Sequence, residues 1–308
     1  MLVVSSYARA GGLAYGFAND SDYEMAFIAE DEEKYFPTLD ENYSGIPIYQ
    51  NFGWMKMASI SNLCANRHID VFTGCPKSNR FTAFYDAEDD KHRDKDVVHW
   101  LNFVRKHRPT VLVFPIHVRT DIARSLKTTL GSVGYSVEWD DFPLTHFGLP
   151  VLHKKTLCIA VQGKKTNVEI PPAPKILTIG DAIGDLDGLN DYRCDSMNDY
   201  QRWCRRYKQF RFKTYNVTPS ERKECVESSN SMDGQLSYLN RNCNRTNLPS
   251  NIHPTERRVF NSREIMRMYG YPDSYAMRFV RYNLNDYVIS DFPPRASYHI
   301  AEYIKQFF

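Results

Sequence analysis

The chain lacks the features that mark several large classes of protein. Its 308 residues hold no apolar run close to the ~20 residues of a membrane-spanning helix. Its first residues show neither the basic segment nor the long apolar segment of a secretory signal. Cysteine is sparse, with seven residues scattered without a Cys-x-x-Cys pair. These absences argue against a membrane partner, a disulfide framework and a zinc or other metal site. We therefore expect reduced thiols in an intracellular protein of the nucleus or the cytoplasm.

A strong charge of one sign is also missing. The chain has 39 Lys and Arg against 37 Asp and Glu, which gives a net charge of +2. This balance is too even to predict a nucleic-acid partner, so the local distribution of charge must decide. Hydrophobic residues at 42% and charged residues at 25% are typical of a globular protein. The length fits one large domain, or a large and a small one.

Residues 1–163 alternate short apolar segments with segments of helical periodicity, which predicts an α/β domain with a βαβ-type sheet. The expected helices are Val97–His107 and Ile122–Val133. The expected strands are Leu2–Ser5, Met25–Ala29, Ile69–Thr73, Val111–Pro115 and Leu157–Val161.

The second half of the chain is less regular. Residues 164–174 are polar and rich in proline, which is typical of a linker or surface crossing. Residues 187–252 lack clean periodicity, and we expect them to form a separate irregular region. Regular patterns resume at Ser262–Tyr269 and Ser297–Phe308. We expect residues 253–308 to complete the α/β domain.

The most distinctive segment runs from His253 to Asp273. It resembles a late motif of the DNA (cytosine-5) methyltransferases, and six residues keep the family's spacing without a gap. They are Arg263, Glu264, Arg267, Gly270, Pro272 and Asp273. Four further stretches resemble family segments in the correct order. They are residues 7–17, 24–42, 134–150 with its Gly-Tyr and Gly-Leu-Pro pieces, and 176–186.

The resemblance implies a Rossmann-like fold of the S-adenosylmethionine-dependent methyltransferases, with 187–252 as a smaller irregular target-recognition region. It also implies that Tyr7, Gly11, Gly12 and Glu30 bind the cofactor. Arg9, however, replaces a glycine of this turn, where its side chain would either block the methionine end of the cofactor or bind an anion. We therefore expect S-adenosylmethionine to bind weakly or not at all. The alternative for Glu30 is one acid in a solvated run.

The catalytic positions depart from the family. Cytosine C5 methylation needs a thiolate that adds to C6 of a flipped base, but Ser78 falls at the nucleophile and Cys75 lies three residues too early. Pro115 falls at the glutamate that holds the ring, and His153 at an arginine that positions the loop and base. We expect a catalytically inactive member, a pseudoenzyme. An active enzyme that uses Cys75 or Ser78 through a rearranged loop stays open as the alternative.

Residues 201–213 carry basic side chains interleaved with aromatic ones and no acid. Basic groups neutralise phosphates and aromatic faces stack on bases, so the run favours contact with nucleic acid, with DNA as the first expectation. The residues expected to make this contact are Arg202, Trp203, Arg205, Arg206, Tyr207, Lys208, Phe210, Arg211 and Lys213. Two alternatives stay open: a structural element with solvated arginines, and a scaffold subunit of a protein assembly.

Overall fold

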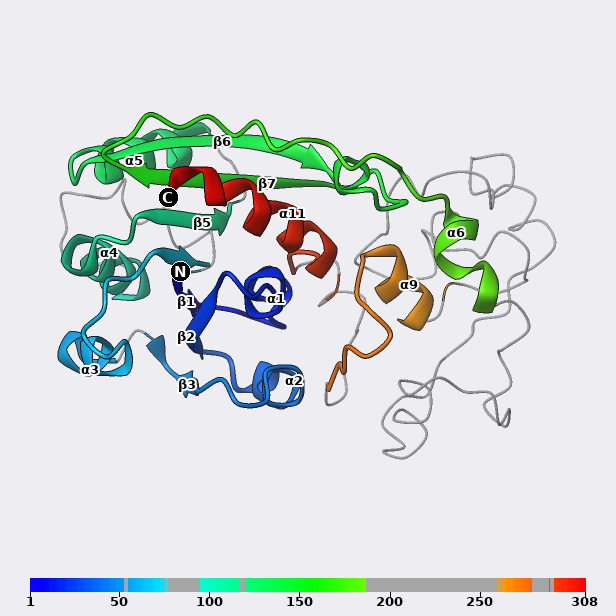
Figure 1. Ribbon diagram of the computed structural model, residues 1–308, viewed down its shortest axis with the longest axis horizontal. Helices are drawn as coiled ribbons and strands as arrows, with labels where there is room; N and C mark the ends of the chain where they lie inside the picture. The colour runs from blue at the N-terminus through cyan, green and yellow to red at the C-terminus, as the bar shows by residue number, and fades with distance from the viewer. Residues whose placement is uncertain are drawn as a thin grey trace. The chain divides into compact units, whose positions relative to one another are not determined.

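A mixed sheet forms the centre of the computed structural model (Figure 1). Its strands are β1 Leu2–Ser6, β2 Glu24–Glu30, β3 Ile48–Gln50, β4 Val71–Thr73, β5 Val111–Pro115, β6 Tyr135–Pro143 and β7 Lys154–Gln162. The seven strands lie in the order β3-β2-β1-β4-β5-β7-β6. Neighbours from β3 to β5 are parallel, whereas β7 pairs with β5 in the antiparallel sense. The structure describes residues 1–52, 55–74, 76, 95–116, 120–186, 260, 262–278, 288 and 291–308.

Helices alternate with the strands along the first half of the chain. The helices are α1 Gly12–Ala18, α2 Phe36–Asn42, α3 Met57–Leu63, α4 Lys95–His107, α5 Thr120–Gly131, α6 Ile179–Ile183, α9 Ser262–Met268 and α11 Pro294–Ile304. Figure 1 shows α3, α4 and α5 on one side of the sheet and α1, α2 and α11 on the other. No helix within the described ranges is both long and apolar enough to cross a membrane. The expected α/β class with a βαβ-type sheet is confirmed.

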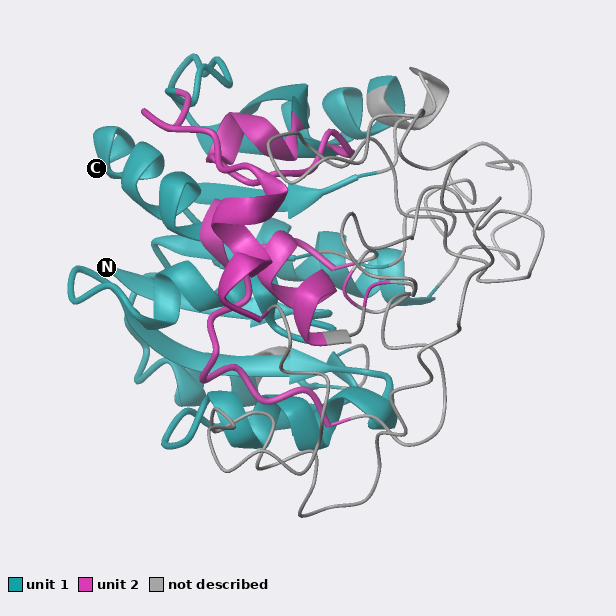
Figure 2. Cartoon of the chain, turned by 90° about the vertical axis from the view of Figure 1, so that its right-hand side faces the viewer, with its two compact units in different colours: residues 1–142, 155–171, 297–308 teal, residues 143–154, 172–296 magenta. Residues whose placement is uncertain are grey.

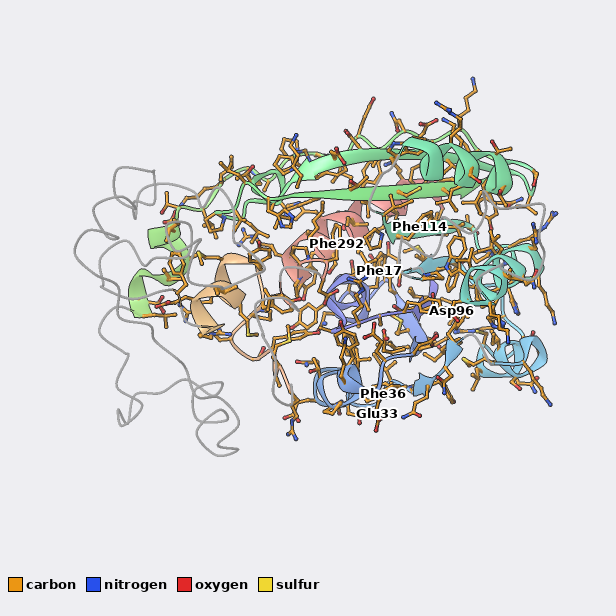
Figure 3. All side chains as sticks on the ribbon, turned by 180° about the vertical axis from the view of Figure 1, so that it is seen from behind. Phe17, Glu33, Phe36, Asp96, Phe114 and Phe292 are labelled. Atoms are coloured by element: carbon orange, nitrogen blue, oxygen red, sulfur yellow. The ribbon has the colours of Figure 1, made fainter. Side chains whose placement is uncertain are left out.

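Large aromatic side chains fill the space between the sheet and α4. The rings of Phe72 and Phe103 have centroids 4.1 Å apart, and Trp100 stacks on Phe72 at 5.9 Å. Phe114 on β5 meets the edge of Trp100 at 5.3 Å, and its position is labelled in Figure 3. All four side chains are fully buried, so they account for much of the apolar surface that this layer removes from water.

The five expected strands are present: Val111–Pro115 has the expected bounds, and the other four differ by one to three residues at one or both ends. Two further strands, β3 and β6, were not predicted. In β6, Tyr135 and Val137 point into the core, but residues 138–141 are partly or fully exposed at the edge of the sheet, so the strand lacks a long apolar run. The last helix begins at Pro294 and not at Ser297, because proline is well suited to the first turn of a helix.

The described chain falls into two compact units (Figure 2). Unit 1 comprises residues 1–142, 155–171 and 297–308, and unit 2 comprises residues 143–154 and 172–296. Each unit is therefore assembled from segments that are distant in sequence. The expected recognition region at 187–252 lies outside the described residues.

Candidate cofactor and catalytic positions

The turn between β1 and α1 has an unusual backbone. Tyr7, Arg9 and Gly11 have φ values of 49°, 54° and 93°, so three residues of five lie in the left-handed region. A side chain tolerates this region poorly, at a cost on the order of 1–3 kcal/mol. Arg9 thus keeps the backbone that a glycine would adopt, which agrees with the glycine that the resemblance implies at this position.

Gly11 is required by neighbours within unit 1. A Cβ atom there would lie 2.6 Å from Cε2 of Tyr43 and 3.0 Å from Cδ2 of Leu39. The Tyr43 hydroxyl also donates a short hydrogen bond to the Gly11 carbonyl. Gly12, the next residue, is buried at the start of α1. Gly11 therefore has a packing role in the fold itself.

Glu30 ends β2 and is only 2% exposed, so the reading of this residue as a solvated acid is wrong. Its Oε1 atom accepts hydrogen bonds from the backbone N–H groups of Asp31 at 2.9 Å and Glu32 at 2.8 Å. Its Oε2 atom accepts one from the N–H of Arg9 at 2.5 Å. Burial raises the pKa of this carboxyl to about 7, against the opposing effect of the three N–H donors. The side chain thus ties β2 to the turn after β1.

Tyr7 lies against a residue that the sequence did not single out. Its ring meets the ring of Phe52 edge-on, with centroids 5.6 Å apart. Its hydroxyl donates to the carbonyl of Asp96 at 3.4 Å, at the start of α4 (Figure 3). The N–H of Phe52 in turn donates to Oδ1 of Asp31 at 2.7 Å. Phe52 follows a strand of only three residues, and this weak signal explains why it was missed.

The expected glutamate position at the end of β5 holds a proline. Pro115 is the last residue of the strand and pairs in register with Leu157 of β7. The following N–H, of Ile116, donates to the carbonyl of Thr156 at 3.1 Å. A pyrrolidine ring offers no proton and no hydrogen-bonding atom to a cytosine. Ser78 and Cys75, which follow β4, lie outside the described residues.

His153 lies in unit 2, directly before β7. Its carbonyl accepts the N–H of Leu144 at 2.9 Å. Its Nδ1 atom is 3.4 Å from the hydroxyl of Tyr269, and the two rings meet at an angle. The imidazole is therefore in contact with the segment that follows α9.

The late motif forms a network of ion pairs in unit 2. Arg267 donates to Asp273 through two parallel hydrogen bonds, Nε to Oδ1 at 2.8 Å and Nη2 to Oδ2 at 2.6 Å. It also pairs with Asp185, which belongs to another stretch that resembles the family. Arg263 is 1% exposed, pairs with Asp273 and donates to the carbonyl of Pro272 at 3.3 Å. The network thus fixes the turn after α9 and joins it to the segment after α6. The partnership with Asp185 was not predicted.

Gly270 in this motif also has a structural reason. Its φ is 75°, and a Cβ atom there would lie 2.7 Å from Cβ of Arg295 and 2.8 Å from Cδ2 of Leu149. The next residue, Tyr271, donates its hydroxyl to buried Asp291 at 3.1 Å. The retained residues Arg263, Arg267, Gly270 and Asp273 are thus accounted for by contacts within unit 2.

The nine residues expected to touch nucleic acid, within 201–213, lie outside the described residues. Among the residues that are described, no group of three His, Cys, Asp or Glu side chains is arranged to hold a metal ion.

Comparison with known proteins identifies the scaffold. Residues 1–306 match the model of the C-5 cytosine-specific DNA methylase family. A protein assigned as a DNA modification methyltransferase, encoded within an E. coli prophage, has a similar structure with a TM-score of 0.73 at 14% identity. That similarity covers 100% of this chain and 99% of the other. Comparison with curated protein sequences gives no match.

Two further structures are similar over nearly their whole length. The Dnmt2 methyltransferase of S. pombe has a TM-score of 0.60 at 12% identity and covers 99% of both chains. The methyltransferase EhMeth of Entamoeba histolytica has a TM-score of 0.62 at 12% identity and covers 99% of this chain and 98% of the other. The seven-stranded α/β architecture is therefore that of the S-adenosylmethionine-dependent methyltransferases, as expected.

Proposed function

The chain belongs to the C-5 cytosine-specific DNA methylase family. We propose that it binds nucleic acid, most simply DNA, and that it does not transfer a methyl group. The scaffold of the family is present from the first strand to the last helix. What departs from the family is the set of residues that would act on the base.

Pro115 is the observation that carries this proposal. It ends β5, in a sheet whose overall fold is similar to that of a DNA modification methyltransferase. The cytosine ring must be held and polarised there while a nucleophile adds to it, and proline has no group that does either. Ser78 at the nucleophile position supports the same conclusion, because an unactivated hydroxyl is a far weaker nucleophile than a thiolate. His153 at the arginine position removes a third contact.

Members of the family take the methyl group from S-adenosylmethionine. The described residues at the corresponding turn do not fit this cofactor as they stand. Both carboxylate oxygens of Glu30 already accept backbone N–H groups, and its side chain is 2% exposed. Arg9 adds a long side chain where the family has none. We therefore propose at most weak binding of S-adenosylmethionine.

Composition supports nucleic acid as the partner. The run 201–213 combines six basic side chains with four aromatic rings and has no acid. It belongs to the part of the sequence that reads DNA in the family. Phosphate neutralisation supplies most of the affinity of such segments, and stacking adds to it on single strands.

Binding to duplex and single-stranded DNA across a range of salt concentrations tests the proposal. On duplex DNA each phosphate contact contributes roughly 0.9 to the log–log slope, so Arg205→Ala/Arg206→Ala/Arg211→Ala should flatten it by about 2.7. Affinity should fall for many sequences alike. Trp203→Ala or Phe210→Ala should cost about 1–3 kcal/mol on single strands.

The matched control removes three positive charges from exposed positions in unit 1, as Lys56→Ala/Arg105→Ala/Lys106→Ala. This variant should keep the wild-type slope. Equal slopes for both triple variants would assign 201–213 to structure. A wild type that binds no nucleic acid at low salt would overturn the proposal and favour a scaffold subunit of a protein assembly.

A further inference from the structure

Ligands of Rossmann-like sheets bind beyond the carboxyl ends of the parallel strands. In unit 1 the carboxyl ends of three neighbouring strands bring the turn after β1, the end of β2 and the segment after β3 together. The register pairs Ser6 with Ala29 and Glu30 with Gln50, so these ends are adjacent. The side chains that extend from them contact one another.

The polar part of this contact is the carboxylate of Glu30. A carboxylate has about four acceptor positions, and three are filled by N–H groups of residues 9, 31 and 32. Only 2% of the residue is exposed, so the carboxyl group is buried. Backbone N–H groups of left-handed turns form concave sites for anions. Here the side-chain carboxyl of Glu30 takes that place.

The apolar part is the ring of Phe52, which is fully buried. It packs against Tyr7 at 5.6 Å, Phe72 at 5.8 Å, Phe103 at 5.4 Å and His99 at 5.2 Å. Aromatic neighbours thus surround the ring from β4, from α4 and from the turn. Its N–H is fixed by Asp31, so the backbone after β3 is anchored as well.

We propose that the protein's own groups fill this end of the sheet. The Glu30 carboxyl binds the N–H groups of the turn, and the Phe52 ring fills the apolar space beside it. Unit 1 then folds and persists without the adenosyl group of S-adenosylmethionine. The inference rests on the proposed function and deepens it by naming the closing contacts. A protein that transfers no methyl group can still bind the cofactor, so failure of this inference leaves the proposed function standing.

Calorimetry of the full chain with S-adenosylhomocysteine, which carries the same adenosyl group, is the first test. We expect no binding tighter than a dissociation constant of about 1 mM. A micromolar constant would overturn the closure, whatever the outcome of the nucleic-acid experiment.

Thermal unfolding of variants is the second test. Glu30→Ala should lower the Tm by about 4 °C or more, by the same amount with and without S-adenosylhomocysteine. Glu33→Ala is the matched control, because Glu33 is an exposed neighbour beside α2 (Figure 3) and should leave the Tm unchanged. If Glu30→Ala does not fold, Glu30→Gln replaces it. The oxygen of the Gln amide can still accept two N–H groups, whereas its NH2 group would face the N–H of Arg9. A wild-type Tm raised by S-adenosylhomocysteine, with that rise lost in the Glu30 variant, would overturn the inference.

Discussion

The turn after β1 in unit 1 and the α9 motif in unit 2 both keep residues of the family, but they differ in what those residues contact. In the α9 motif, Arg267 and Asp273 pair with each other and complete a network within the unit. At the turn, Glu30 retains its place but binds backbone groups that include the N–H of Arg9. In the α9 motif, the residues that match the family's spacing have partners inside the unit. Pro115, by contrast, falls where the resemblance implies a residue that contacts the base.

The largest effect is expected from breaking the α9 network. Asp273→Ala would remove the ion pair with Arg263, which is 1% exposed, and both bonds to Arg267. Removing a carboxylate that pairs with a buried guanidinium costs about 3–5 kcal/mol of unfolding free energy, which denaturant titration measures. Asp185→Ala is the control: its side chain is 64% exposed, so the cost should stay below about 1 kcal/mol. Equal losses of unfolding free energy in the two variants would show that the pairs of Asp273 with Arg263 and Arg267 do not stabilise unit 2 as proposed.

The turn after β1 should respond to pH through the carboxyl of Glu30. The pKa of Glu30 is raised from 4.5 to about 7 in the folded protein, so the folded state holds this proton more tightly than the unfolded state. Its contribution to stability is therefore complete below about pH 4.5 and is lost as the pH rises to about 7. Glu30→Gln does not titrate. The difference in unfolding free energy between wild type and variant should shrink by roughly 3 kcal/mol across this window. Parallel pH profiles of the two proteins would contradict the assignment.

Glycine packing offers a smaller effect in unit 1. A Cβ atom on Gly16 would overlap the backbone carbonyl of Ser297, and the N–H of Gly16 donates to the Ser297 hydroxyl at 2.6 Å. Gly16→Ala should thus cost about 1–3 kcal/mol through overpacking. Gly131→Ala, at the end of α5, meets no atom within 4 Å and should leave stability unchanged or raise it by up to about 1 kcal/mol. Chemical denaturation measures the unfolding free energy of both variants. An unchanged value for Gly16→Ala would contradict the close packing of α1 on α11.

The smallest effect concerns His99, which packs edge-on against Phe52. Burial lowers the pKa of its imidazole, and its Nε2 atom has no hydrogen-bond partner among the described residues. The folded state then resists protonation, so stability is present above about pH 6.5 and is lost as the pH falls below it. His99→Phe should remove part of this acid sensitivity in thermal melts between pH 5 and pH 8. Identical melting profiles would show that His99 does not contribute.

The strands of the sheet were predictable where apolar runs are continuous, as at Val111–Pro115. The edge strand β6 was not, because its exposed residues 138–141 hide the alternation. Glu30 could be singled out by its place after a strand, but its partners are backbone N–H groups, which no side-chain pattern reveals. Phe52 is a single aromatic residue after a short strand, and only the packing of distant elements makes it part of the site.

We expect that this scaffold does not perform the family's chemistry. The most direct test is transfer of a tritiated methyl group from S-adenosylmethionine to cytosine in DNA, with the purified full-length chain. We expect incorporation at background, because the resemblance places Ser78, Pro115 and His153 at the positions of the family's nucleophile, glutamate and arginine. Incorporation above background that is abolished by Cys75→Ala or Ser78→Ala would contradict it and establish an active enzyme with a rearranged loop.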